Sequence, residues 1–364
     1  MNPLALSDMP VASPHAHGGN SVTRTMFRVQ AALAPATLFA FWLYGWPAFF
    51  LFVSTIASCI GWEALCLRLA GRTRIRATLM DGSAALTGWL LALTLPPWAP
   101  WWLAVVGGFV AIVIGKQVFG GVGQNVFNPA MVARVALLVS FPIPMTTWVM
   151  PVSVMHVSSP DLLEGFRIFL GLNPIPDAMT SATLLGHAKT ELSRGVDLMT
   201  ALSPGDHLVS WTGLRPGSLG ESSAILLLGG GLFLLLARVI TWHIPVAVLA
   251  GMGLPALIAH GIDPAHFLAP QIHVLSGAAM LGAFFIATDY VTSPNTKWGQ
   301  VVFGLGVGFF AWIIRTYGGY PEGVGFGVLL MNAMTPIIDR YIKPRILGRD
   351  RRGRPLDLPT REAS

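Results

Sequence analysis

The chain has 364 residues, of which 53% are hydrophobic and only 11% are charged. Soluble globular domains carry about 25% charged residues, so this composition excludes a soluble protein of the same size, and the high apolar content excludes a disordered chain. Lys and Arg exceed Asp and Glu by 23 to 17, an excess that either membrane topology or a nucleic-acid partner could explain.

Apolar runs along the chain predict an all-α polytopic membrane protein. A membrane-spanning helix needs about 20 mostly apolar residues, and glycine or proline is tolerated where neighbouring helices satisfy the backbone. About ten transmembrane helices are expected, at 28–45, 47–67, 82–97, 101–119, 127–145, 222–241, 243–261, 268–288, 299–316 and 322–342. They divide the chain into an N-terminal segment (1–27), a first five-helix group (28–145), a large outer, periplasmic loop (146–221), a second five-helix group (222–342) and a basic tail (343–364).

The distribution of charge predicts the orientation of these spans. Basic residues precede the first span, fill the second-to-third connection and dominate the tail: Arg24, Arg28, Arg68, Arg72, Arg74, Arg76, Arg340, Lys343, Arg345, Arg349, Arg351, Arg352, Arg354 and Arg361. The 146–221 loop holds seven acidic and four basic residues. By the positive-inside rule both termini are expected on the cytoplasmic side of the membrane, so no nucleic-acid partner is needed to explain the basic excess.

The two halves resemble each other weakly. Residues 81–86 align with 276–281 at an offset of 195, and 119–121 align with 317–319 at an offset of 198. Five spans in each half would make the repeats inverted in the membrane, an arrangement that places sites at broken helices. Chance similarity between glycine-rich apolar segments is the alternative.

The first motif, residues 120–130, lies between the fourth and fifth spans. It contains Gly123, Asn125 and Asn128, followed by Pro129. Asn128 and Pro129 are typical of a helix start and its cap. The two asparagines could also face one pocket and bind the polar edge of a planar ligand. From the residues alone both interpretations stay open.

The second motif, residues 177–183, lies in the outer loop, and by itself it is typical of a polar turn.

The third motif, residues 315–321, lies at the end of the ninth span. Arg315 would lie on the outer side against the usual charge bias, where it could extend to the interface or pair with a phosphate or carboxylate.

Few other residues carry candidate chemistry. Glu63, Asp81 and Asp289 lie in or at the edges of spans, where acids mark ion paths unless they are interfacial, and Arg134 has a similar status. Two cysteines are too few for a four-ligand cluster, and the nine histidines form no ligand spacing, so no metal site is expected.

In order and spacing these three motifs, with residues 286–289 and 331–333, resemble the NqrB/RnfD family over most of residues 25–348. This family comprises the flavin-bearing membrane subunits of the Na⁺-pumping NADH:quinone reductase and of the Rnf complex. The compact N-terminus and the ending at 339–345 resemble the RnfD branch, the one found in the Rnf complex.

The resemblance implies a covalent FMN. The family esterifies the flavin phosphate to the last threonine of an Asp-(Gly/Ala)-x-(Ser/Thr)-x-Ala-Thr pattern. Residues 177–183 meet this pattern in full, which makes Thr183 the acceptor and Asp177, Thr180 and Ser181 its neighbouring motif residues. Leu184 follows where many relatives have proline.

The resemblance also implies a non-covalent riboflavin. Gly123, Asn125 and Asn128 match the family's Gly-x-Gly-x-Asn-x-x-Asn-Pro pattern. The expected topology places them towards the cytoplasm and Thr183 on the outer side, so two flavins would form an electron route through the bilayer.

The leading hypothesis is therefore an electron-carrying subunit of the Rnf complex, part of an ion-translocating oxidoreductase and not catalytic alone. It would work with RnfA, RnfB, RnfC, RnfE and RnfG, especially the FMN-bearing RnfG, and with membrane lipid, and would couple ferredoxin and NAD(H) exchange to Na⁺ or H⁺ movement. A small-solute or ion channel or transporter of five-plus-five architecture is the alternative.

Overall fold

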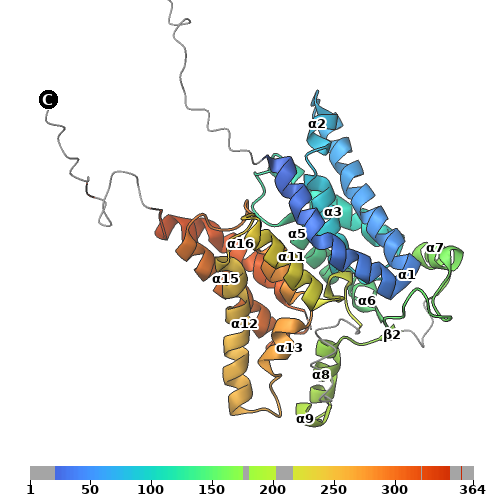
Figure 1. The fold of residues 1–364 in the computed structure, drawn as a ribbon, viewed down its shortest axis with the longest axis vertical. Coiled ribbons are helices and arrows are strands. Elements are labelled where there is room, and N and C mark those ends of the chain that lie inside the picture. The colour runs from blue at the N-terminus through green and yellow to red at the C-terminus, as the bar shows by residue number, and fades with distance from the viewer. Residues whose placement is uncertain (1–20, 175–179, 202–215, 321, 345–353, 355–364) are drawn as a thin grey trace, which may run out of the picture.

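The structure, a computed structural model, describes residues 21–174, 180–201, 216–320, 322–344 and 354. Asp177, most of the expected N-terminal segment 1–27 and most of the basic tail lie outside the described residues. The described chain is mostly helical, as the composition predicts (Figure 1).

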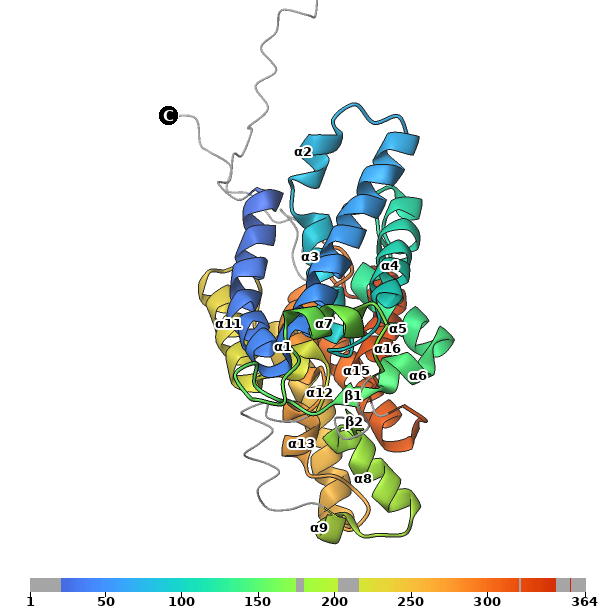
Figure 2. The same cartoon turned by 90° about the vertical axis from the view of Figure 1, so that its right-hand side faces the viewer.

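The first two expected spans are the two arms of one interrupted helix, α1 (Val22–Leu69). Ser21 caps its start by accepting a hydrogen bond from the N–H of Arg24. Gly45 breaks it with φ of 72° and ψ of −158°, and Pro47, which has no N–H to donate, follows two residues later. The arms run in roughly opposite directions in Figure 2, dark blue and then lighter blue.

The remaining helices of the first half are shorter than expected. Leu95 and Phe141 leave the helical conformation because each precedes a proline, which disfavours helical backbone at the residue before it. The elements are α2 (Ile75–Leu79), α3 (Ser83–Thr94), α4 (Trp101–Phe109), the π-helical turn η2 (Val110–Ile114), the 3₁₀ turn η3 (Gln117–Phe119), α5 (Pro129–Ser140) and α6 (Pro142–Thr146).

The described residues of the connecting segment, 146–221, form short elements. Two two-residue strands pair antiparallel, with Trp148 opposite Ser181 and Val149 opposite Thr180, a pairing that the all-α expectation did not include. The elements are β1 (Trp148–Val149), α7 (Leu162–Phe169), β2 (Thr180–Ser181), α8 (Leu184–Ser193), α9 (Leu198–Ala201) and η5 (Leu219–Glu221). Figure 1 places α8 and α9 at the opposite end of the molecule from α2.

The second half contains one broken span. The expected helix 268–288 is divided at Gly277, whose φ is 65°, a left-handed value that glycine adopts readily. The elements are α11 (Ala224–Leu236), α12 (His243–Ile262), α13 (Pro270–Leu275), α14 (Ala279–Leu281), the π-helical η6 (Gly282–Ile286), α15 (Lys297–Tyr317) and α16 (Val324–Tyr341).

Among the described residues, four helices are long and apolar enough to cross a membrane: α1, residues 101–119, α12 and α15. Three shorter apolar helices, α3, α5 and α11, accompany them. Large hydrophobic side chains such as Leu38, Leu257 and Val302 are exposed on these helices, as expected for contact with lipid. The chain is therefore a multi-pass membrane protein, and the count of ten spans stays a prediction.

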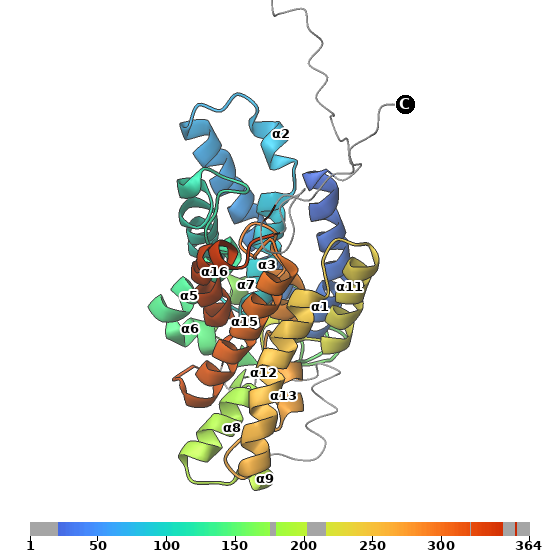
Figure 3. The same cartoon turned by 90° about the vertical axis from the view of Figure 1, so that its left-hand side faces the viewer.

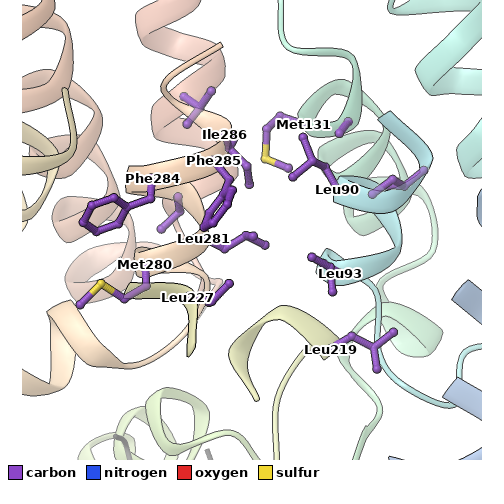
Figure 4. Packing of buried hydrophobic residues seen from close by; sticks show 14 of the residues in the cluster. Leu90, Leu93, Met131, Leu219, Leu227, Met280, Leu281, Phe284, Phe285 and Ile286 are labelled. Atoms are coloured by element: carbon purple, nitrogen blue, oxygen red, sulfur yellow. The ribbon is translucent and has the colours of Figure 1, made fainter. Parts of the chain in front are cut away.

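The main apolar core joins the two halves. Figure 4 shows Leu90, Leu93 and Met131 of the first half across from Leu281 and Phe285 of the second. Within the second half α12 and α15 lie side by side (Figure 3), and a Cβ at Gly308 would collide with the Val248 carbonyl. Glycine therefore lets these two helix backbones approach closely.

Candidate functional site

Thr183 begins α8. It has extended backbone, and its Oγ1 accepts a hydrogen bond of 3.1 Å from the N–H of Gly186, so it is the N-cap of the helix. The pairing of Ser181 with Trp148 fixes the chain just before it. The first turn of a helix presents unsatisfied N–H groups and a positive dipole end, which favour an anion such as a phosphate.

Gly186 leaves room beside the Thr183 hydroxyl. A Cβ at position 186 would lie 3.1 Å from Thr183 Oγ1, closer than ordinary contact. Because glycine has no Cβ, no side chain at position 186 crowds the hydroxyl. The threonine and its surroundings thus fit a phosphoester at a helix N-terminus. The two neighbouring motif residues, Thr180 and Ser181, form strand β2, which pairs with β1.

A cavity of about 220 Å³, here called the α8 cavity, lies against the same helix. One wall comes from α8, with Leu185 and Lys189, and the other comes from the ends of α13 and α15, with His273, Arg315 and Thr316. Three buried polar atoms of that second wall have no hydrogen-bond partner among the described residues: His273 Nδ1, Arg315 Nε and Thr316 Oγ1. Such orphaned atoms in an amphipathic cavity fit a planar ligand with polar edges.

Arg315 is buried, with 5% of its surface exposed, and does not extend to solvent. Its Nη1 donates to the carbonyl of His273 and its Nη2 to that of Ser276 at 3.1 Å. Arg315 therefore binds the C-terminal end of α13, where the expected span is broken. Lys189 of α8 donates to the carbonyls of Arg315 and Gly318, which docks α8 on the same place. Burial lowers the pKa of Lys189.

Gly123, Asn125 and Asn128 lie together on the wall of a second cavity, here called the asparagine cavity. Asn128 caps α5 by accepting from Met131 N–H at 3.3 Å, and its amide donates to the carbonyl of Ile286 in the second half. Asn128 therefore starts a helix, as one interpretation expected, and it also lines a cavity, while the binding of a planar ligand stays a prediction.

Asn125 uses only part of its hydrogen-bonding capacity. Its Nδ2 donates to the Phe127 carbonyl at 3.0 Å, and its side-chain oxygen makes no hydrogen bond to the described residues. Apolar side chains of both halves, including Leu90 and Phe285, complete the wall. An amide edge among apolar side chains suits a flavin ring, so the residues present fit this group as well.

Sequence reasoning missed Lys116, which also lines the asparagine cavity. Its Nζ lies 2.6 Å from Glu63 Oε1, and both side chains are almost fully buried. The sequence marks Glu63 as an intramembrane acid, but its partner lies 53 positions away. The available signal was that Lys116 is the sole charged residue in the expected fourth span, 101–119.

Comparison with known proteins decides the family. The sequence model described as the NQR2, RnfD, RnfE family matches residues 10–348. The chain belongs to this family. Membership of the NQR2, RnfD, RnfE family confirms the resemblance drawn from the motifs. The matched residues, 10–348, include Thr183 and the lining of both cavities.

Individual relatives within the family are similar over nearly the whole chain. A protein of Halorhodospira halophila is 48% identical over 347 residues, 95% of this chain and 97% of its own. A protein of Stutzerimonas stutzeri is 50% identical over 338 residues, 93% of this chain and 95% of its own. A protein of Rhodobacter capsulatus is 50% identical over 308 residues, 84% of this chain and 85% of its own. Each is named as the D subunit of an ion-translocating oxidoreductase complex.

Proposed function

We propose that this protein is RnfD, the flavin-bearing D subunit of an Rnf complex, which carries electrons while the complex moves Na⁺ or H⁺ during ferredoxin and NAD(H) exchange. The observation that carries the proposal is Thr183. It ends the family's attachment pattern, caps a ten-residue helix and has no side chain of residue 186 beside its hydroxyl. The names of the relatives support the same complex.

The residues around Thr183 would hold a covalent FMN in defined ways. The N–H groups of the first turn of α8 would bind the phosphate, and the α8 cavity beside them would take the ring. The tether keeps the cofactor from diffusing away outside the cytoplasm. FMN supplies the one- and two-electron chemistry, while the chain positions and shields it.

A second, non-covalent riboflavin would occupy the asparagine cavity. Asn125 offers an amide oxygen without a partner among the described residues, and Asn128 fixes that wall to the second half through Ile286. The α8 cavity and the asparagine cavity share no lining residue, so the two cofactors would be separate steps of one electron path.

The expected topology is part of the proposal. Both termini would be cytoplasmic in a bacterial inner membrane, with the connecting segment outside, where RnfG would bring its own FMN. RnfA, RnfB, RnfC and RnfE would complete the complex. Two inverted repeats are supported by Gly82 and Gly277, which precede α3 and α14 and both have positive φ.

Contacts of two buried cations support the repeat further. Lys116 Nζ donates to Ser83 Oγ, next to Gly82, and Arg315 Nη2 donates to the carbonyl of Ser276, next to Gly277. Lys116 and Arg315 lie 199 positions apart, close to the offsets of the aligned segments.

The test is flavin fluorescence on a denaturing gel. The full chain, made in a host with a flavin transferase, should give a band that fluoresces under ultraviolet light. Thr183→Val should remove the fluorescence while membrane insertion is kept. Thr190→Val, which removes an exposed hydroxyl from the same helix, is the matched control and should keep the band.

A wild-type band that stays dark under these conditions would contradict the proposal. Dark protein that also passes small solutes across proteoliposomes would identify the channel or transporter instead.

A further inference from the structure

Lys116 and Glu63 form an ion pair inside the apolar bundle. Glu63 comes from the second arm of α1 and Lys116 from the turn between η2 and η3; the exposed fractions of their side chains are 0% and 4%. Ser83 Oγ accepts a hydrogen bond from Lys116 at 2.8 Å, and Gln117 donates to Glu63 Oε1 at 2.9 Å. Taking two charges out of water costs much of what their attraction returns, so a buried pair is weak evidence for stability.

The pair is placed asymmetrically with respect to the asparagine cavity. Lys116 and Ser83 are part of the cavity wall, whereas Glu63 is not and lies behind them. Glu63 Oε2 has no hydrogen-bond partner among the described residues. The cation is therefore the member of the pair that a ligand in the cavity would meet.

Asp289 is the acid on the same wall. Its carboxylate is already engaged, because it accepts from the N–H of Val291 at 3.2 Å and from the hydroxyl of Thr292 at 3.3 Å. Lys116 thus places a positive charge at the cavity wall, where its ion pair with Glu63 holds it. Because the surroundings are buried, this charge is screened only weakly.

We propose that Lys116 stabilises the negative charge that a flavin in the asparagine cavity gains on reduction, and that Glu63 holds its ammonium group at the cavity wall. This inference rests on the proposed function, because it requires a flavin in this cavity. A charge near a flavin ring changes its reduction potential, so Lys116 raises the potential and Glu63 moderates the rise.

The test is a redox titration of the non-covalent flavin by visible absorbance. The full chain carries Thr183→Val, so that only flavin of the asparagine cavity is observed, and is supplied with riboflavin. Lys116→Met should shift the reduction equilibrium at least tenfold towards the oxidised form, which corresponds to about 30 mV for two electrons. Lys116→Arg keeps the charge and should stay close to the parent.

Removing Glu63 should shift the potential the other way. Arginine stays protonated in proteins, so Glu63→Gln is made in the Lys116→Arg background, where its potential should rise relative to Lys116→Arg alone. Lys297→Met is the matched control: it removes an exposed cation from the start of α15 and should leave the potential unchanged.

The outcomes separate this inference from the proposed function. Riboflavin absent from acid extracts of the parent chain would count against the proposed function. Bound flavin with the same potential in Lys116→Met, or a lower potential on Glu63→Gln, would overturn the role of Lys116. If Lys116→Met and Lys116→Gln both insert normally but lose the flavin, Lys116 serves to hold the cofactor, and the electrostatic role is overturned too.

Discussion

Gly186 follows Thr183 in the first turn of α8, and under the proposed function the space that a side chain at position 186 would take is left to the phosphoester. Glycine is otherwise an unfavourable choice inside a ten-residue helix, where alanine would be about 1 kcal/mol more stable. Under the proposed function, access to the hydroxyl and not helix stability accounts for the glycine.

Gly186→Ala should separate these two effects. Its Cβ would lie 3.1 Å from Thr183 Oγ1, so FMN attachment should slow, while α8 itself should gain about 1 kcal/mol. The measurement is the growth of in-gel flavin fluorescence with time after induction. Thr190→Ala, on the exposed side of α8, provides the comparison. Attachment in Gly186→Ala at the wild-type rate would show that the space has no such role.

The sequence was informative at residues whose partners are local. Asn128 was expected as a helix cap, and its hydrogen bond to Met131, three positions later, confirms this. Lys116 shows the limit, since its partner Glu63 and the cavity wall are assembled from segments far apart in the chain. Arg315 was expected near the outer interface, but its contacts with His273 and Ser276 could not be inferred from its neighbours.

At the scale of elements, described helices lie within the expected spans, but several of them are shorter than expected or interrupted. Gly45 and Pro47 mark the reversal in α1, and Pro96 and Pro142 explain why α3 and the helix α5 stop early. The break of span 268–288 at Gly277 was not predicted, because an apolar run with one glycine also fits a continuous helix. The carbonyls freed there are satisfied by Arg315, which lies 38 positions later.

Two adjacent glycines in α11 predict opposite responses to alanine. At Gly230 a Cβ would collide with the carbonyl of Ala32 in α1, whereas at Gly229 it would meet nothing within 4 Å. Gly230→Ala should therefore destabilise the protein by about 1–3 kcal/mol through overpacking, and Gly229→Ala should be neutral or slightly stabilising. Thermal unfolding in detergent measures both. Equal midpoints for the two variants would contradict close packing of α11 on α1.

At the scale of the whole molecule, charged residues as well as apolar packing join the two halves. Arg134 of α5 forms a buried pair of 2.8 Å with Glu322, which precedes α16. Glu221 belongs to the same cluster, and burial, followed by the neighbouring Glu322, raises its pKa. The halves therefore meet at Arg134 as well as at the core of Leu90, Met131 and Phe285.

Breaking this pair should be costly. Arg134→Met leaves Glu322 buried without its cation, and we expect a loss of about 3–5 kcal/mol. Replacing both residues, as in Arg134→Met with Glu322→Leu, should recover part of that loss because no lone charge remains. Arg194→Met removes a pair that is 67% exposed on the arginine side and should cost less than about 1 kcal/mol. If Arg134→Met alone and the double variant with Glu322→Leu unfold at the same temperature, this account is wrong.

The burial of Thr183 has a consequence for the order of assembly. Only 3% of this residue is exposed, and its hydroxyl is already engaged with the N–H of Gly186. An enzyme that modifies the hydroxyl must reach it, so the first turn of α8 has to open, or must not yet have formed, at that moment. Under the proposed function the cofactor is therefore added while the first turn of α8 is open or unformed, and the fold then closes over the bond.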